Sequence, residues 1–388
     1  MRPRFDARPV LATAFAGAVA IGLVKDLLRT ETAGVDFHTY LAAAIVGLHD
    51  GWANIYDQAL VAAAQRALDA HQWAQPFLST PPVAVLVAPL AAIRYPDAYL
   101  VWAALTMAAF AAALAWSSPY RGPARWLAAG AALVPWWVVH AVHVGQVAPL
   151  IAASVVVAWR LLRDERDIAA GAVLGVVLLK PNTAFLVPVA LLFIARWRAL
   201  AAWLAVAAVV AIASFALIGP GGAAAYVQQV THVPADVLRG AVLLTIAGAF
   251  PMSPFLALVL RVAIVAVAAA AMYRYRREPG MAIAVAGIAS LLTATYLHGS
   301  DLCMFTAVGW IAWHERAEPA WRALIAGIWV LSTPFLDGSA LAPALNRWVV
   351  CELVVFIAFA LDALVRPAFS RRRQALTGWA ASGSRAPA

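Results

Sequence analysis

The sequence predicts an all-α polytopic membrane protein, and three observations lead to that fold class. Of its 388 residues, 64% are hydrophobic and only 12% are charged, whereas a soluble globular domain has about 45–50% apolar and about 25% charged residues. The mean hydropathy is +0.82. Apolar runs follow one another at helix length, without the alternating pattern of a transmembrane β-barrel. Because no polar stretch is long enough for a separate soluble domain, residues 1–388 are predicted to form one integral membrane domain.

The apolar runs predict about twelve transmembrane helices. The first run follows three arginines and resembles a signal peptide, but many spans follow it, so we interpret it as a retained helix. Several runs are shorter than the roughly 20 residues of a perpendicular crossing, which indicates broken helices or helices that end inside the protein. A short, proline-bounded piece at 82–93 is interpreted as a re-entrant or interfacial segment. The predicted spans are 10–28, 98–117, 126–142, 147–162, 168–180, 183–197, 200–218, 257–273, 281–297, 302–314, 322–335 and 346–365.

The formal net charge of +9 predicts an orientation rather than a nucleic-acid partner. Its arginines cluster in short loops and at the two ends of the chain, as the positive-inside bias predicts for cytoplasmic segments. If all basic loops are cytoplasmic, the twelve spans alternate without contradiction and both termini lie inside. The outer face then receives the loops at 30–81 and 219–254 and most of the histidines.

The stretch "GVDFHTYLAAA" places Asp36, His38 and Tyr40 where the first helix emerges on the outer side. A carboxylate at the membrane boundary is costly unless it is hydrated, paired or used, which makes Asp36 a functional candidate. An ordinary loop aspartate that caps a juxtamembrane helix would give the same pattern.

Lys180 interrupts an apolar run in "GVVLLKPNTAFLVP". A lysine followed by proline between two half-length segments indicates two helices that meet at a break. An ammonium group there would suit a phosphate or a carboxylate. A lysine that snorkels to the interface would also fit the pattern.

Two further polar groups are expected on the same outer face. "VHVGQVAP" supplies His143 and Gln146 beside a glycine that permits a tight turn, and "ATYLHGSD" supplies His298 and Asp301 at the end of a helix. A histidine and an aspartate three residues apart can handle a proton or bind a hydroxyl, although polar caps of a helix terminus would look alike. We find no metal-ligand triad, phosphate-binding glycine loop or nucleotide fingerprint. Two cysteines justify neither a metal site nor a disulfide.

In these stretches the chain resembles the polyprenol-phosphate-sugar-dependent glycosyltransferases of family 87, which have the C-type (GT-C) membrane fold. The matching stretches stand in family order: "DFHTYLAAA" followed by "GWANIYD", "STPPVAVLVAPLAA", "GQVAPLIAASVVVA", and "AGAVLGVVLLKPNTAFLVPVALL" followed by "RWR". The resemblance covers residues 10–218 well and residues 219–388 only by hydropathy, apart from "YLHGSD". The family often has an aromatic residue before the double proline, where this chain has Ser79 and Thr80.

The resemblance implies an inverting transfer of a hexose, usually mannose, from a polyprenyl phosphate to a lipid or glycan hydroxyl. Asp36 occupies the position of the general base, and His298 best matches a late histidine near the site. Lys180 is then the candidate for the donor phosphate, and the expected substrate-binding residues are His38, Tyr40, His143, Gln146, Asn182 and Asp301. No metal or other cofactor is expected, because the polyprenyl-phosphate sugar is a co-substrate. Such enzymes work in the bacterial inner membrane, with the active site on the periplasmic side.

Two alternatives remain open from the sequence. A transporter or flippase of lipid-linked sugars would predict inverted repeats with charges near the membrane midplane, and no convincing repeat is present. Another GT-C transferase, with an arabinose-type donor, would use the same residues. The partners expected on either enzyme reading are the lipid-linked donor, the acceptor and membrane lipids, and no nucleic acid.

Overall fold

The computed structural model describes residues 33–231, 244–333 and 346–365, and every regular element in these ranges is helical. The predicted all-α fold class is therefore confirmed. The predicted first span and both termini lie outside the described residues. The α-helices are α2 (Val35–His49), α3 (Gln58–Leu68), α4 (Pro81–Val87), α5 (Tyr95–Ser117), α6 (Pro123–Ala132), α7 (Trp136–His143), α8 (Ala148–Arg163), α9 (Asp167–Val173), α10 (Leu186–Phe193), α11 (Trp197–Thr231), α13 (Ile246–Ala249), α14 (Pro254–Arg274), α15 (Pro279–Thr293), α16 (Cys303–Glu315), α17 (Pro319–Leu331) and α19 (Asn346–Val365).

Short 3₁₀ segments connect several of these helices at the points where the apolar runs break. They are η2 (Trp52–Asn54), η3 (Ala88–Ala92), η4 (Leu174–Leu179), η5 (Pro181–Thr183) and η6 (Gly299–Leu302). Two of them, η4 and η5, flank Lys180, so the helix break predicted there is confirmed. The piece predicted at 82–93 is α4 followed by η3, and its re-entrant or interfacial position stays a prediction.

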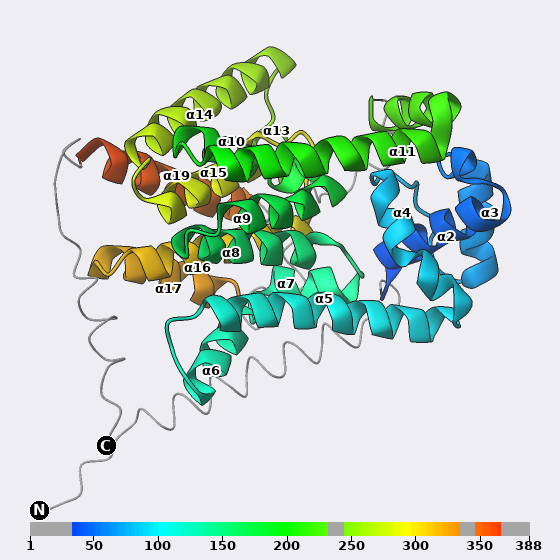
Figure 1. The fold of residues 1–388 in the computed structure, drawn as a ribbon, viewed down its shortest axis with the longest axis horizontal. Coiled ribbons are helices and arrows are strands. Elements are labelled where there is room, and N and C mark those ends of the chain that lie inside the picture. Colours follow the sequence, from blue (N-terminus) through cyan, green and yellow to red (C-terminus); the bar gives the residue numbers. More distant parts are fainter. Residues whose placement is uncertain (1–32, 232–243, 334–345, 366–388) are drawn as a thin grey trace, which may run out of the picture.

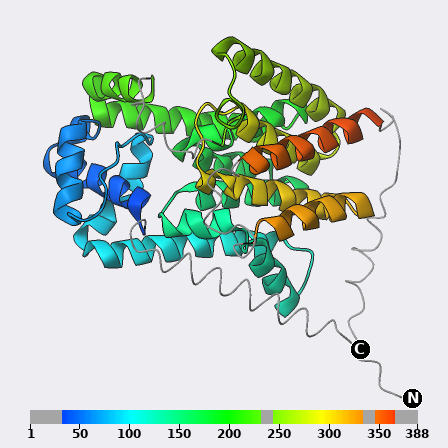
Figure 2. The ribbon, with the colours of Figure 1, turned by 180° about the vertical axis from the view of Figure 1, so that it is seen from behind.

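The helices form a bundle with a smaller helical cap at one end (Figure 1). The long helices α5 and α11 run along two sides of the bundle and reach the cap, which α2, α3 and α4 form. The same arrangement is seen from behind in Figure 2. The predicted outer loop at 30–81 thus contains α2 and α3.

Four of the described helices are long and apolar enough to cross a membrane, namely α5, α11, α14 and α19. The pair α6 and α7 makes a fifth candidate if it counts as one broken span, because the two helices meet at an angle of 81°. The predicted count of twelve spans is not confirmed, although most predicted runs coincide with a helix. The runs that fall short, such as 183–197, become short helices because prolines and breaks interrupt them.

Helix α15 lies at the centre of the bundle, and all but its first residue are buried. It packs against α10, α14, α16 and α19. Near the start of α15, an ion-pair cluster joins neighbouring segments around the buried Arg316. Its guanidinium lies 2.7 Å from Glu278 Oε2 and 3.1 Å from Asp362 Oδ2, and both carboxylates are partly exposed. The Tyr275 hydroxyl also donates to Asp362, at 2.7 Å. This cluster, formed by Tyr275, Glu278, Arg316 and Asp362, is called the Arg316 cluster below.

Candidate functional site

The first residues of α2 are held in place by the turn that follows α7. Gly34 precedes the helix with a φ of 73°, a left-handed conformation that glycine adopts without strain. Its N–H donates to the His143 carbonyl at 2.7 Å, and the N–H of Asp36 donates to the Val144 carbonyl at 2.8 Å. Backbone groups that a helix start leaves unpaired are thus satisfied by a segment more than 100 residues away. This fixes Asp36 in the first turn of α2.

The same turn brings Gln146 to Asp36. Gly145 also has a positive φ of 73°, and a Cβ atom there would lie 2.5 Å from Phe37 Cβ, so only glycine allows this approach. Gln146 Nε2 donates to Asp36 Oδ2 at 2.9 Å. Gln146 Oε1 accepts hydrogen bonds from the Tyr40 hydroxyl and from the Val147 N–H. These two donors orient the amide so that its NH₂ group faces the carboxylate.

Lys180 lies at the break between η4 and η5, where its φ of −150° and ψ of 79° are not helical. The Thr80 hydroxyl lies 3.0 Å from each of the Leu178 and Leu179 carbonyl oxygens, which the end of η4 would otherwise leave unpaired. The Thr80 of the double-proline segment therefore supports the loop that carries the lysine. Lys180 Nζ forms a salt bridge of 2.6 Å with Asp301 Oδ1.

Asp301 is completely buried, and its two oxygens are bonded to three residues from two distant segments. Oδ1 also accepts a hydrogen bond from the Thr183 hydroxyl at 3.2 Å, and Oδ2 accepts one from the His298 N–H at 2.9 Å. Asn182 Nδ2 donates to the Tyr296 carbonyl at 2.7 Å, which ties the loop before η6 to the lysine break. His298 Nε2 in turn hydrogen-bonds the Tyr296 hydroxyl.

Electrostatics join the Asp36 group to the Lys180 group. Burial raises the pKa of Asp36 to about 6, while the positive charge of Lys180 and the Gln146 hydrogen bond lower it and the charge of Asp301 raises it. The pKa of Tyr296 is raised by burial and by the charges of both Asp36 and Asp301. Burial, and then the Lys180 charge, lower the pKa of His298 to about 4. Residues from four distant stretches therefore form one polar cluster, called the polar site below.

Most of the residues predicted from the sequence fall in or beside the polar site. The structure brings together Asp36, Tyr40, Gln146, Lys180, Asn182, His298 and Asp301. His38 turns elsewhere, because its Nε2 lies 2.8 Å from the Gln65 carbonyl of α3 and its ring packs against Tyr95. His143 is buried, and its carbonyl contributes to the site by accepting from Gly34 and from the Tyr99 hydroxyl.

Sequence reasoning missed three residues of the polar site: Thr80, Thr183 and Tyr296. Tyr296 stands two residues before His298 in the same loop, and this proximity is the only signal in the sequence. No sequence pattern around either threonine indicates a functional role, because each hydrogen-bonds a residue that is far away in the sequence. In the described ranges, no group of three or more His, Cys, Asp or Glu side chains is arranged to hold a metal ion.

The polar site has the parts that a group transfer between a hydroxyl and an anionic leaving group needs. Asp36, Lys180 and His298 are all half-buried, whereas Asp301 and Gln146 are enclosed. Gln146 occupies one oxygen of Asp36, and no described residue hydrogen-bonds the other, Oδ1. A carboxylate with one open oxygen can accept a proton, and an ammonium group near it can stabilise a departing anion.

Comparison with known proteins gives one finding. A sequence model of glycosyltransferase family 87 matches residues 77–297, which is more than half of the chain. No curated protein and no solved structure matches. The matched region contains the Gln146 turn, the Lys180 break and Tyr296, while Asp36 lies before it and His298 and Asp301 lie just after it. The chain belongs to glycosyltransferase family 87, and the resemblance seen in its sequence is thereby confirmed.

Proposed function

We propose that this glycosyltransferase moves a hexose, with mannose as the first candidate, from a polyprenyl-phosphate donor to a hydroxyl of a lipid or glycan acceptor. The observation that carries the proposal is the Lys180–Asp301 salt bridge of 2.6 Å in the same polar site as the Asp36–Gln146 hydrogen bond of 2.9 Å. The Lys180 charge also acts on the pKa of Asp36. A base and a cation in one half-open site suit a donor whose leaving group is a phosphate. Family membership supports the reaction class.

Asp36 acts as the general base in this proposal. The acceptor hydroxyl donates a hydrogen bond to Asp36 Oδ1, and its oxygen attacks the anomeric carbon of the donor sugar. As the new C–O bond forms, the hydroxyl proton passes to the carboxylate. The bond from the anomeric carbon to the phosphate oxygen breaks on the opposite face, so the anomeric configuration is inverted. A β-linked donor would give an α-linked product.

Lys180 stabilises the phosphate that leaves. The donor is a phosphodiester with one negative charge, and the departing polyprenyl monophosphate gains a second. Lys180 Nζ has three N–H donors, of which Asp301 uses one. The remaining donors can meet the phosphate oxygens as charge develops, which is the transition-state interaction that speeds transfer. Neutral His298, with its ring bonded to the Tyr296 hydroxyl, is proposed to bind or orient the sugar at the same site.

The proposal places the protein in the bacterial inner membrane with the polar site at the outer face. The apolar helices and the membrane family support a membrane protein. No metal or other cofactor is required in this scheme, because charge neutralisation is assigned to Lys180. Orientation can be tested at Asn54, which is exposed in the helical cap. A cysteine there should react with an impermeant maleimide added from outside intact cells, and labelling only after lysis would contradict the orientation.

The function itself is tested with purified protein, polyprenyl-phosphate mannose radiolabelled in the sugar, and membrane lipids of the host. We expect a labelled glycolipid or glycan that requires both donor and acceptor lipids. A parallel reaction with an arabinose-type donor decides between sugars. If neither donor gives product while labelled donor still binds, the choice of donor sugar is wrong. If neither donor binds, the proposal of a polyprenyl-phosphate substrate is wrong.

A further inference from the structure

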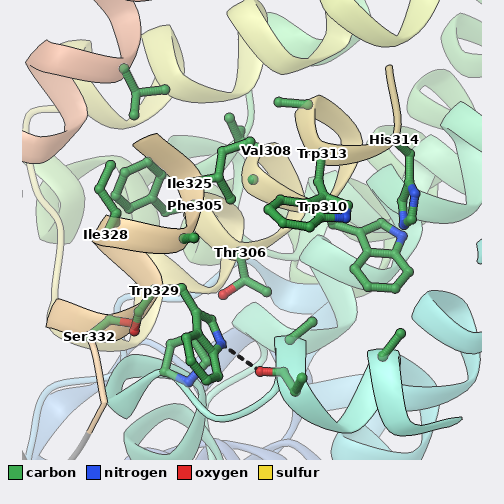
Figure 3. Close-up of a pocket in the computed structure, with 18 of the residues that line it drawn as sticks. Phe305, Thr306, Val308, Trp310, Trp313, His314, Ile325, Ile328, Trp329 and Ser332 are labelled. Atoms are coloured by element: carbon green, nitrogen blue, oxygen red, sulfur yellow. Dashed lines mark hydrogen bonds between the residues drawn. The ribbon is translucent and has the colours of Figure 1, made fainter. Parts of the chain in front are cut away.

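A second site is indicated by a cavity of about 350 Å³ among α6, α7, α16, α17 and α19. Its volume falls within the usual range of small-molecule sites, about 300–1,000 Å³. Figure 3 shows its wall, in which Phe305, Trp310, Ile325 and Ile328 expose apolar surface and Thr306 adds a hydroxyl. The Thr306 hydroxyl already accepts the Trp137 indole N–H at 2.8 Å.

The cavity lies along α16 and extends in the direction that leads away from the polar site. Asp301 lies two residues before α16 begins, and His314 lies one residue before it ends. At about 1.5 Å per residue, the 13 residues of this helix separate the two by about 20 Å. The cavity lining includes Phe305 near the start of α16 and His314 near its end. An elongated apolar ligand would therefore lie along α16, with one end at His314.

His314 gives this end of the cavity a polar group without a bonding partner. Its Nε2 atom is buried and has no hydrogen bond within the described residues. The ring is held by aromatic neighbours, with centroid distances of 4.5 Å to Trp310 and 6.2 Å to both Trp159 and Tyr120. A buried polar atom with no partner loses free energy, so a ligand that supplies one would be bound there favourably.

Two guanidinium groups lie near His314, although neither lines the cavity itself. Arg163 lies over the Trp159 ring at 5.4 Å, and Arg322 lies over the Trp313 ring at 5.4 Å. The charges of both act on the His314 imidazole. Neither guanidinium forms an ion pair with an acidic side chain in the ranges that the structure describes. The nearby Glu315 carboxylate is turned toward α8, where it accepts the Trp159 indole N–H at 2.8 Å.

We propose that this cavity binds an anionic glycerophospholipid, with one acyl chain along α16 and the phosphate between Arg163 and Arg322. The apolar wall matches a hydrocarbon chain, and the two guanidiniums, which form no ion pair within the described ranges, match a phosphate in charge and geometry. Trp313, which lies beneath Arg322, is partly exposed and suits the depth of a lipid headgroup, whereas Trp159 beneath Arg163 is buried in the bundle. In the predicted orientation, this site faces the cytoplasmic leaflet, where the anionic headgroups attract basic residues. The site is separate from the polar site and does not depend on the reaction proposed there.

The test uses the full chain in phosphatidylcholine nanodiscs that contain a small fraction of phosphatidylglycerol with a diazirine in one acyl chain. After irradiation, labelled peptides are mapped by mass spectrometry. We expect labelling of α16 and α17, and much weaker labelling when the diazirine is carried by phosphatidylcholine. Arg163→Gln and Arg322→Gln should each reduce labelling about fivefold, the effect of one basic residue at an anionic membrane surface. Arg276→Gln is the matched control, because Arg276 also lies over an aromatic ring, Tyr273, but its charge is not among those that act on His314.

A second pair of variants tests the proposed position of the acyl chain in the cavity. Gly309 lines the cavity, and an added Cβ would meet nothing closer than 3.8 Å, so Gly309→Leu should fill the space and abolish labelling. Gly327 has open space around it and does not line the cavity, so Gly327→Leu should leave labelling unchanged. Equal labelling by both lipid classes would overturn the choice of an anionic lipid. Labelling that survives Gly309→Leu, or that falls on residues 1–32 or 366–388 instead, would overturn the site.

Discussion

The polar site and the Arg316 cluster are both built from a cation, carboxylates and a tyrosine, but they differ in how the charges are balanced. Arg316 is 1% exposed and lies between two carboxylates, Glu278 and Asp362. Lys180 is 13% exposed and has one carboxylate partner, Asp301. The second carboxylate of the polar site, Asp36, is bonded to an amide instead of a cation. In the Arg316 cluster both carboxylates are bonded to the cation, whereas in the polar site one carboxylate, Asp36, is not bonded to the cation.

This difference indicates a structural role for the Arg316 cluster and a catalytic role for the polar site. A fully paired cluster holds its segments together, and removing its buried cation leaves the carboxylates without their partner. A site for group transfer needs charges that the protein itself does not neutralise, because the substrate must meet them. The unbalanced cluster is therefore the one to which we assign the reaction. Four substitutions test the comparison.

Asp36→Asn should have the largest effect. The amide keeps the size of the carboxyl group but cannot accept a proton, so we expect kcat to fall by about 10²–10⁴-fold, the usual contribution of a general base. Donor affinity and thermal stability should stay close to the wild type. Asp50→Asn, at the exposed end of the same helix, is the control and should be fully active. A turnover near the wild-type value would end the assignment of Asp36 as the base.

Arg316→Leu should act on stability and leave the chemistry intact. Removing one partner of a fully buried ion pair costs about 3–5 kcal/mol. Here two carboxylates lose their cation, but both are partly exposed, so the cost should be smaller than that. We expect a lower midpoint of thermal unfolding, with transfer per folded molecule unchanged. The half-buried pair of Arg196 and Asp167, 3.1 Å apart, is the matched control, because Arg196→Gln should cost only about 0–1 kcal/mol. Lost activity in a folded Arg316→Leu protein would remove the distinction between the two clusters.

Gln146→Leu should change the pH dependence more than the maximal rate. Asp36 is active as a base when it is deprotonated, so kcat/KM should rise with pH through its pKa of about 6. The Gln146 hydrogen bond lowers that pKa. Without it the pKa rises, and the acid limb should move to higher pH, with the rate recovering above it. An unmoved acid limb would show that Gln146 does not act on Asp36.

Thr183→Val should give the smallest effect. It removes one hydrogen bond to Asp301, which Lys180 and the His298 N–H still hold. A hydrogen bond to a charged group contributes about 1.5–3 kcal/mol at most. Only the fraction of this free energy that positions Lys180 affects the binding of the donor. We expect donor affinity to fall by less than about tenfold and kcat to stay the same. A large fall in kcat would place Thr183 in direct contact with the reacting atoms.

Local signals predicted the all-α fold class and the break at Lys180, and they pointed to most of the polar residues that the structure brings together. Composition and apolar runs gave the fold class, and the Lys-Pro pair gave the break at Lys180, because both features depend on neighbours in the chain. Which runs cross the membrane was less predictable. The run at 126–142 is bent by 81° between α6 and α7, and the positions of such bends depend on packing against other helices.

The connections within the polar site could not be predicted, because they join residues that are far apart in the sequence. Asp36 and His38 are two residues apart, yet one faces Gln146 and the other faces α3. Thr80 supports the end of η4 from a position 98 residues earlier. The sequence shows a glycine at position 145, but it does not show that Phe37, the residue whose close approach requires this glycine, packs against it.

The central claim is that Asp36 and Lys180 share one site, and a titration of the Asp36 carboxyl group tests it without depending on activity. Its infrared band can be assigned by its absence from Asp36→Asn and followed with pH in the wild type and in Lys180→Met. The account predicts a pKa near 6 in the wild type and a higher pKa in Lys180→Met, because the lysine charge favours the carboxylate. Equal pKa values in the two proteins would contradict it.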